Sequence, residues 1–253
     1  MGYPSKCTVL ALLCFSLFLA CKKQEPEKAE TVVIPEAVDL GLSVKWASFD
    51  VGATQPGEIG KYYSWGEIEP RFTYHNWKNY LWCEGSNTKL TKYNYNASYG
   101  DNPDFRIALK PEDDVAHILY GGDWHIPTAD QIRELVESPF IRLSLERNGK
   151  AASMKLTSTK TGQSILIPFG GLCYDTMVPM EENKVGYFWS SVIDYDSRPN
   201  QSISTPDRAG TLCVWIDGLS STAFLPLSFS NMPRSIGMNI RAVYDPGSNG
   251  ESR

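Results

Sequence analysis

The alternation of short apolar segments with glycine- and proline-containing turns, most regular after residue 150, constrains the fold of this chain most. Segments of about four to eight residues in which every second side chain is apolar are typical of β-strands. We therefore predict a hairpin of strands at about 154–158 and 164–168, turning at Gly162. Further strands are predicted at about 43–50, 62–65, 186–192, 210–216, 222–229 and 237–244.

Two short helices are predicted in the middle of the chain. Pro111 and the acidic residues after it suit the first turn of a helix over about 111–120. Thr128 and Gln131 have the spacing of a capping box at the start of a second helix, over about 129–137. Many short, mostly antiparallel strands with two helices clustered mid-chain indicate the α+β class.

The segment GGDWHIPT between these helices raises the question of a chemical site. Asp123 and His125 could form an acid–base or ligand pair beneath a glycine cradle for phosphate. The glycine spacing, however, matches neither the dinucleotide-binding nor the P-loop motif. We interpret the segment as a structural joint, in which Gly121 and Gly122 turn the chain and Trp124 packs inside.

The N-terminus is typical of a secreted lipoprotein. Lys6 precedes the uncharged run 8–20, which is too short to span a bilayer and suits a signal peptide over residues 1–20. The sequence LFLAC resembles a bacterial lipobox, and this resemblance implies that Cys21 is lipidated. We expect an outer-membrane lipoprotein of the cell envelope, with its exposure at the cell surface left open. An ordinary signal peptide on a freely secreted protein is the alternative.

Composition divides the remainder into a disordered tether (21–33), one domain (34–245) and a polar tail (246–253). The net charge of the whole chain is −5, and removal of the signal leaves 23 basic and 29 acidic residues, a net charge of −6. The sequence also lacks basic clusters. This balance argues against nucleic acid as a partner.

Seven segments occur in order along the chain: VDLGLSVKWASFDVGA, YYSWGEIEP, LTKYN, LKPEDDVAH, GGDWHIPT, YFWSSV and NIRAVYD. Together they resemble the major paralogous domain (FISUMP) family of surface lipoproteins over about 36–245. The resemblance implies a C-type-lectin-like domain, a superfold that also includes formylglycine-generating enzymes and retroelement-diversified binding proteins. It supplies no established activity. The residues that carry the family's structural signature are Trp65, Gly121, Gly122, Trp124, Pro127, Thr128, Trp189 and Arg241.

The residues give little support to a metal site. In the family the residue after Trp124 is usually arginine, which argues against a catalytic or ligating His125. The three histidines of the chain show no zinc-ligand spacing. Only Arg198-Pro199-Asn200 and Trp215-Ile216-Asp217 approach the calcium motifs of C-type lectins, and in them an arginine and an isoleucine replace oxygen ligands. We therefore expect no metal and no cofactor.

Cysteines and serines form no recognisable catalytic set. Cys83, Cys173 and Cys213 include no C-x-x-C pair, allow at most one disulfide, and do not match the close cysteine pair of formylglycine-generating enzymes. Ser190 and Ser191 cannot be assigned to a base. We expect no enzyme activity. An enzyme on a formylglycine-generating-like scaffold and a structural, fimbrial-type subunit stay open as alternatives.

The last third of the chain is the expected binding surface. C-type-lectin-like domains present ligands to loops there, which in this chain means 194–205 and 215–234. Aromatic side chains beside short hydroxyl and amide groups suit adaptable recognition. We predict a non-catalytic binding module for a protein or glycan, held at the membrane by its lipid and of the retroelement-diversified type if a template repeat accompanies its gene. The candidate ligand-binding residues are Tyr195, Arg198, Asn200, Trp215, Asp217, Ser220, Ser221, Phe224, Ser228, Asn231 and Arg234.

Overall fold

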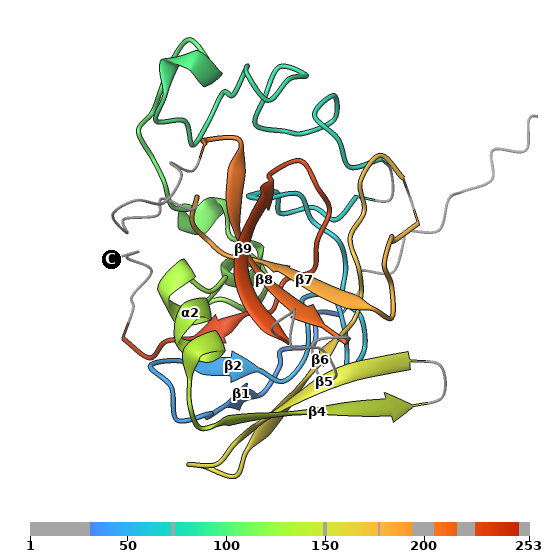
Figure 1. Ribbon diagram of the computed structural model, residues 1–253. Helices are drawn as coiled ribbons and strands as arrows, with labels where there is room; N and C mark the ends of the chain where they lie inside the picture. Colours follow the sequence, from blue (N-terminus) through green and yellow to red (C-terminus); the bar gives the residue numbers. More distant parts are fainter. Residues whose placement is uncertain are drawn as a thin grey trace, which may run out of the picture. The chain divides into compact units, whose positions relative to one another are not determined.

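The computed structural model describes residues 31–71, 74–148, 151–176, 178–193, 205–216 and 226–247. From Val32 onward the chain forms one compact unit, built from short strands and a few short helices (Figure 1). The strands are β1 (Ala37–Val38), β2 (Lys45–Ala47), β3 (Trp124–His125), β4 (Ile141–Asn148), β5 (Ala151–Ser158), β6 (Ser164–Pro168), β7 (Val185–Trp189), β8 (Arg208–Trp215), β9 (Leu227–Pro233) and β10 (Val243–Tyr244). The α-helices are α1 (Val115–Tyr120) and α2 (Ala129–Glu137), and the 3-10 helices are η1 (Ala97–Tyr99) and η2 (Pro111–Asp113).

The first sheet joins distant parts of the chain in the antiparallel order β1-β2-β10-β3. Val243 of β10 lies between Trp46 of β2 and His125 of β3. Trp46 has no exposed surface. The sheet therefore ties the beginning, the middle and the end of the domain together around one buried tryptophan.

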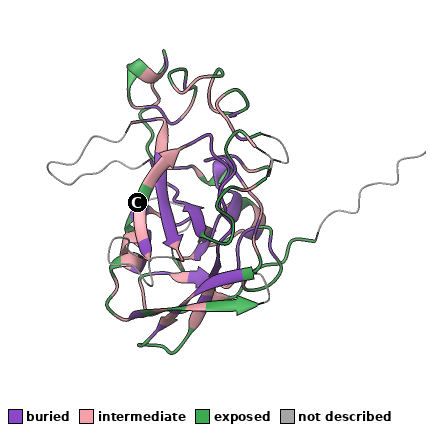
Figure 2. Cartoon of the chain, turned by 45° about the vertical axis from the view of Figure 1, so that its right-hand side comes forward, coloured by how far each residue is buried: buried purple, intermediate pink, exposed green. Residues whose placement is uncertain are grey.

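The second sheet is a three-stranded meander, β4-β5-β6. The predicted hairpin of β5 and β6 is confirmed, with Leu156 opposite Ile165 and Gly162 in the turn at φ +74°. Strand β4 was not predicted. It lies at the edge of the sheet, where only every second residue is sheltered and the last residues are exposed (Figure 2).

The third sheet, β7-β8-β9, separates two apolar clusters. Tyr187, Trp189 and Cys213 point into one cluster, while Phe188 and Leu212 point into the other. This division follows from the two-residue period of a strand. Strand β7 is buried along its whole length, whereas β9 at the other side of the sheet is mostly half-buried.

Each α-helix is short and begins at a side-chain cap. The first predicted helix is split, because Asp114 accepts hydrogen bonds from the N–H groups of Ala116 and His117, which starts α1 at Val115 and leaves η2 as a separate turn. Helix α2 has the predicted bounds and the predicted capping box between Thr128 and Gln131. Within the described residues, no helix has the length and apolar character needed to cross a bilayer.

The expected α+β, C-type-lectin-like fold class is wrong for this structure. Among the described residues, helix accounts for 11% and strand for 32%, and the strands form three small antiparallel sheets. The helices contribute six and nine residues. The fold-class prediction relied too strongly on the two helix signals at 111–120 and 129–137. Most of the fold is made by strands, many of which pair with strands far away in the sequence.

The long aromatic-rich segment 66–108 is held in place by a buried arginine. The guanidinium of Arg234 donates to the carbonyls of Lys92 and Tyr93 at 3.0 Å each and to the hydroxyl of Tyr80 at 2.9 Å. It also lies 4.7 Å from the centre of the Trp65 ring. These contacts fix the segment without regular strands or α-helices.

Candidate functional site

The GGDWHIPT segment is a structural joint in the folded chain. Asp114 accepts a hydrogen bond from the Ile126 N–H at 2.8 Å, and the carbonyl of Pro127 accepts one from Ser191 at 2.8 Å. Gly121 and Gly122 have φ values of +67° and +55°, which favour glycine. The backbone of the joint is therefore tied to α1 on one side and to the end of β7 on the other.

Trp65, Trp189 and Arg241 of the signature are buried, and each is bonded to the surrounding core. The indole of Trp65 donates to the Ser190 carbonyl at 2.8 Å, and the indole of Trp189 donates to the Tyr63 carbonyl at 2.8 Å. Arg241 is fully buried and forms an ion pair with Asp50. These residues hold the fold, and a ligand in solvent cannot reach them.

The lipidation site Cys21 lies outside the described residues. So do seven of the predicted ligand-binding residues: Tyr195, Arg198, Asn200, Asp217, Ser220, Ser221 and Phe224.

Of the four described candidates, Arg234 was wrongly predicted to bind a ligand. Its side chain has no exposed surface, and Nη1 donates to the carbonyls of Tyr93 and Pro206 at 3.0 and 2.9 Å. The guanidinium thus serves the fold and is not presented to a ligand. Sequence position alone suggested a surface role, because arginine is rarely buried without an acidic partner.

The other three described candidates do not share one face of the sheet. Ser228 is opposite Cys213, whereas Asn231 is opposite Gly210, so their side chains leave opposite faces of β9. The side-chain oxygen of Asn231 accepts a hydrogen bond of 2.6 Å from Arg208. Trp215 and Ser228 therefore stay together as candidates, and Asn231 belongs to a different surface.

Trp215 lies against Tyr187 at the end of the third sheet. The two rings meet edge to face with centres 5.9 Å apart. Trp215 is half-buried, while Tyr187 is buried and donates its hydroxyl to Glu181 at 2.8 Å. Burial, followed by the bond to the Glu181 carboxylate, raises the pKa of Tyr187, so its hydroxyl stays protonated as a donor.

The turn that carries Glu181 is strained. Five described residues other than glycine have φ in the left-handed region, and three of them, Asp175, Glu181 and Asn183, fall within 175–183. Such conformations cost on the order of 1–3 kcal/mol each and cluster at functional sites. The carbonyl of Glu181 accepts from the N–H groups of Lys184 and Val185 at 3.0 and 3.1 Å, which holds the turn in this form.

The candidate site is thus defined as the half-buried ring of Trp215, the buried Tyr187 behind it, the carboxylate of Glu181 and the hydroxyl of Ser228. An aromatic side chain bordered by an acid and a hydroxyl can stack on a planar ligand face and bond to its polar edge. Sequence reasoning identified Trp215 and Ser228. It missed Tyr187 and Glu181, because only the fold brings them beside Trp215.

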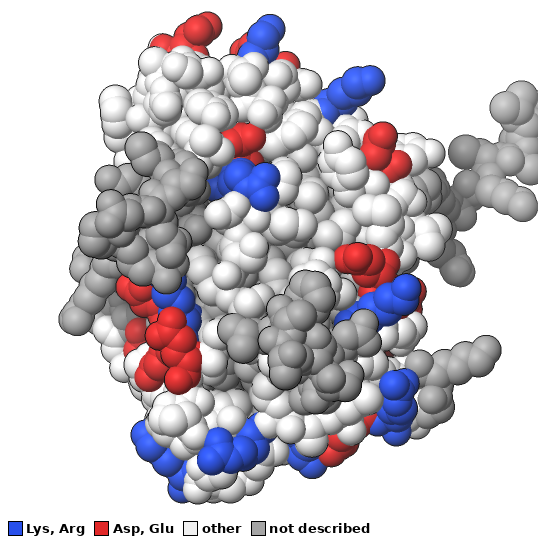
Figure 3. All heavy atoms as spheres, viewed as in Figure 1, with Lys and Arg blue, Asp and Glu red and all other residues white. Residues whose placement is uncertain are grey.

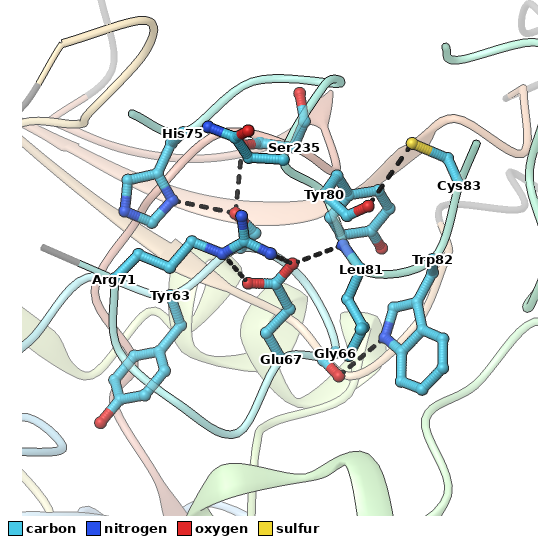
Figure 4. A network of polar contacts seen from close by, with 12 residues as sticks. Tyr63, Gly66, Glu67, Arg71, His75, Tyr80, Leu81, Trp82, Cys83 and Ser235 are labelled. Carbon is cyan, nitrogen blue, oxygen red and sulfur yellow. Dashed lines mark hydrogen bonds and ion pairs between the residues drawn. The ribbon is translucent and has the colours of Figure 1, made fainter. Parts of the chain in front are cut away.

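A second group of polar residues, shown in Figure 4, brings a histidine and a serine together. His75 Nδ1 lies 2.9 Å from Ser64 Oγ, which donates to the Ser235 carbonyl at 3.1 Å. His75 and Ser64 are each only 1% exposed. Burial lowers the pKa of His75 to about 4, helped by the positive charge of Arg71. A serine and a histidine enclosed in this way form a structural contact that substrate cannot approach.

The same region contains the buried carboxylate of Glu67 and the thiol of Cys83 (Figure 4). Glu67 forms a two-bond ion pair with Arg71 and accepts from the Leu81 N–H at 2.8 Å (Figure 4). Burial raises the pKa of Glu67 despite these bonds.

The three described cysteines, Cys83, Cys173 and Cys213, are free thiols. Burial raises the pKa of Cys173 to about 11 and that of Cys213 to about 12, so neither is a ready thiolate.

No cluster of three histidine, cysteine or acidic side chains suited to a metal occurs among the residues that the structure describes. Comparison of the chain with protein-family models, with curated proteins and with solved structures finds no match.

Proposed function

We propose that this chain is a lipid-anchored envelope protein whose folded domain binds a glycan or protein ligand at the candidate site. The single observation that carries the binding proposal is the aromatic pair of Tyr187 and Trp215 beside the strained turn of Glu181. Rigid aromatic rings supply contact area at a low entropic cost. A carboxylate fixed by Tyr187 adds a directional acceptor at the edge of that area.

The charge distribution supports a ligand recognised by stacking and hydrogen bonds. On the face seen in Figure 3, charged side chains of both signs lie in small groups separated by wide uncharged areas. The net charge of the chain is −5. Long-range attraction of a polyanion is therefore not the basis of the proposal.

Binding is proposed in place of catalysis for a positive reason. The hydroxyl of Ser64, the imidazole of His75 and the thiol of Cys213 are buried, whereas Trp215 at the end of β8 is half-buried and Glu181 beside it is exposed. The accessible chemistry is that of recognition.

The anchoring part of the proposal rests on the lipobox-like LFLAC sequence. Its test is metabolic labelling with a palmitate analogue. The full chain should carry the label and the Cys21→Ser variant should not, while globomycin should cause the unprocessed precursor to accumulate. Release of an unlabelled protein into the medium would show an ordinary secreted protein instead.

The binding part is tested on glycan and protein arrays with the purified chain and two site variants. Trp215→Ala and Glu181→Gln should each lose at least about tenfold in affinity for any captured ligand. Glu146→Gln on exposed strand β4 and Phe105→Ala, whose side chain is 73% exposed, are matched controls that should keep full affinity. Equal losses in the control and site variants would exclude the candidate site.

A further inference from the structure

Apolar side chains continue from the candidate site along the chain segment before it. Tyr174, Val178 and Met180 are 46%, 68% and 42% exposed, and Tyr74 is 51% exposed. Isolated exposed apolar residues are ordinary, but several on neighbouring segments mark an interaction surface. We name these four residues the apolar strip.

Backbone hydrogen bonds place the loop of the apolar strip beside the candidate site. Leu172 and Met180 exchange backbone hydrogen bonds of 3.1 and 2.8 Å, which closes the loop that bears Tyr174 and Val178. Met180 is followed directly by Glu181, the acceptor of the Tyr187 hydroxyl. The loop therefore ends at the residue that borders the site.

Tyr74 is fixed beside this loop by its neighbours in sequence. The Asp175 N–H donates to the His75 carbonyl at 3.0 Å, and the Asn76 side chain donates to the Asp175 carboxylate at 2.8 Å. His75 itself is packed against Gly237, where a Cβ would lie 2.5 Å from the ring. The two tyrosines are thus carried by segments that are bonded together and attached to the core.

Contacts within the protein hold the backbone beside Tyr174 in one conformation. Asp175, between Tyr174 and Thr176, has φ +49°, which is unfavourable for a non-glycine residue. Its carboxylate is already used by Asn76. A surface held in one conformation in advance loses little entropy on binding.

Resting on the proposed function, we propose that the ligand is a linear, uncharged polysaccharide that runs along the apolar strip and contacts several sugar units at once. Tyr74 and Tyr174 would stack on units beyond the one held by Trp215. The residues from Tyr174 to Met180 include no lysine or arginine, which disfavours an anionic chain or an anionic lipid surface. A row of rings serves an extended repeating ligand better than a compact one.

The test measures affinity against chain length. The full chain is titrated by calorimetry with neutral β-linked gluco-, xylo- and manno-oligosaccharides, from disaccharide to octasaccharide. Affinity for the series that binds should rise by about tenfold or more with length. Tyr174→Ala and Tyr74→Ala should each remove roughly three- to tenfold from the affinity for the long members and leave the short ones unchanged.

Variants and outcomes separate this inference from the proposed function. Tyr174→Phe and Tyr74→Phe keep the rings and should bind like the native chain, while Trp215→Ala should weaken binding at every length. Two results would overturn the polysaccharide inference and leave the proposed site intact. In the first, affinity does not depend on the length of the oligosaccharide. In the second, Tyr174→Ala and Tyr74→Ala bind like the native chain while Trp215→Ala abolishes binding. A protein ligand with no saccharide binding would also overturn it. Full saccharide binding by Trp215→Ala would instead overturn the proposed site.

Discussion

Arg241 and Asp50 form an ion pair of 2.6 Å in which neither side chain has any exposed surface. The arginine also donates to the carbonyls of Ala47 and Leu166, at 2.9 and 2.7 Å. One guanidinium thereby joins the first sheet to the second. Burial raises the pKa of Asp50 to about 6, against the lowering effect of Arg241.

Removal of either partner of this ion pair should be strongly destabilising. Arg241→Met leaves a buried carboxylate and two carbonyls without a donor, and we expect it to lower the free energy of unfolding by about 3–5 kcal/mol. Asp50→Asn keeps the shape of the side chain but leaves the buried guanidinium, which stays protonated, without its counter-charge. Its loss should therefore be of similar size. Urea denaturation at pH 7 measures both, and a loss below about 1 kcal/mol in either variant would contradict this account.

Arg234→Met should loosen the aromatic segment 66–108 selectively. The substitution leaves the carbonyls of Lys92, Tyr93 and Pro206 without their donor, which should cost about 3 kcal/mol or more. Hydrogen exchange should accelerate most in 80–93 and least in β5. A uniform increase across the domain would mean that Arg234 supports the core as a whole.

The parts of the fold that sequence predicted are local. The β5–β6 hairpin and the Thr128–Gln131 capping box depend on residues close together in the chain, and both are present. Strand β4 carries the same alternation, in Ile141, Leu143 and Leu145, and was within reach of the same reasoning.

The pairing of the first sheet could not be predicted in this way. Strands β2 and β10 fall inside the predicted strands at 43–50 and 237–244. Strands β1 and β3 have two residues each, too few to show a period, and the four strands pair across most of the chain. The tertiary role of Arg234 was equally hidden, because its acceptors are backbone carbonyls that any residue type provides. The strained turn at Glu181 leaves no compositional mark either, since glutamate is not a residue that favours φ of +60°.

His75 should make stability depend on pH. Its pKa is lowered to about 4 in the folded state, while the unfolded chain has the ordinary value of 6.5. Between these values the unfolded state binds the proton and the folded state does not, so the His75 contribution falls as pH decreases. From pH 7 to pH 4 the loss should approach about 3 kcal/mol.

Asp50 works in the opposite direction, because its raised pKa favours the folded state as pH falls from about 6. The His75 effect is therefore isolated by comparison with His75→Asn, which retains a donor toward Ser64 and does not titrate. The difference in unfolding free energy between the native chain and this variant should shrink as the pH is lowered. A difference that is constant from pH 7 to pH 4 would show that His75 is not enclosed.

The joint between α1 and α2 should respond to substitution at its cap and not at its histidine. Thr128 accepts from the Gln131 N–H, and Gln131 accepts from the Thr128 N–H at 2.8 Å. Thr128→Ala should therefore lower the unfolding free energy by about 1 kcal/mol. His125→Arg should stay within about 0.5 kcal/mol. A large loss of ligand binding with His125→Arg would reopen the chemical interpretation of GGDWHIPT.

Relief of strain at Glu181 should separate stability from binding. Glycine adopts φ of +60° freely, which relieves strain, but Glu181→Gly also removes the acceptor of the Tyr187 hydroxyl. The two effects oppose each other, so the unfolding free energy should change by no more than about 1 kcal/mol. The same substitution removes the carboxylate beside Tyr187 and should abolish ligand binding. Glu182→Gly, one residue on and without a left-handed φ, should lower stability by about 0.5–1 kcal/mol and keep binding. Thermal unfolding with array binding on all three proteins decides the matter: a Glu181→Gly variant that binds normally would show that the strained turn serves the fold alone.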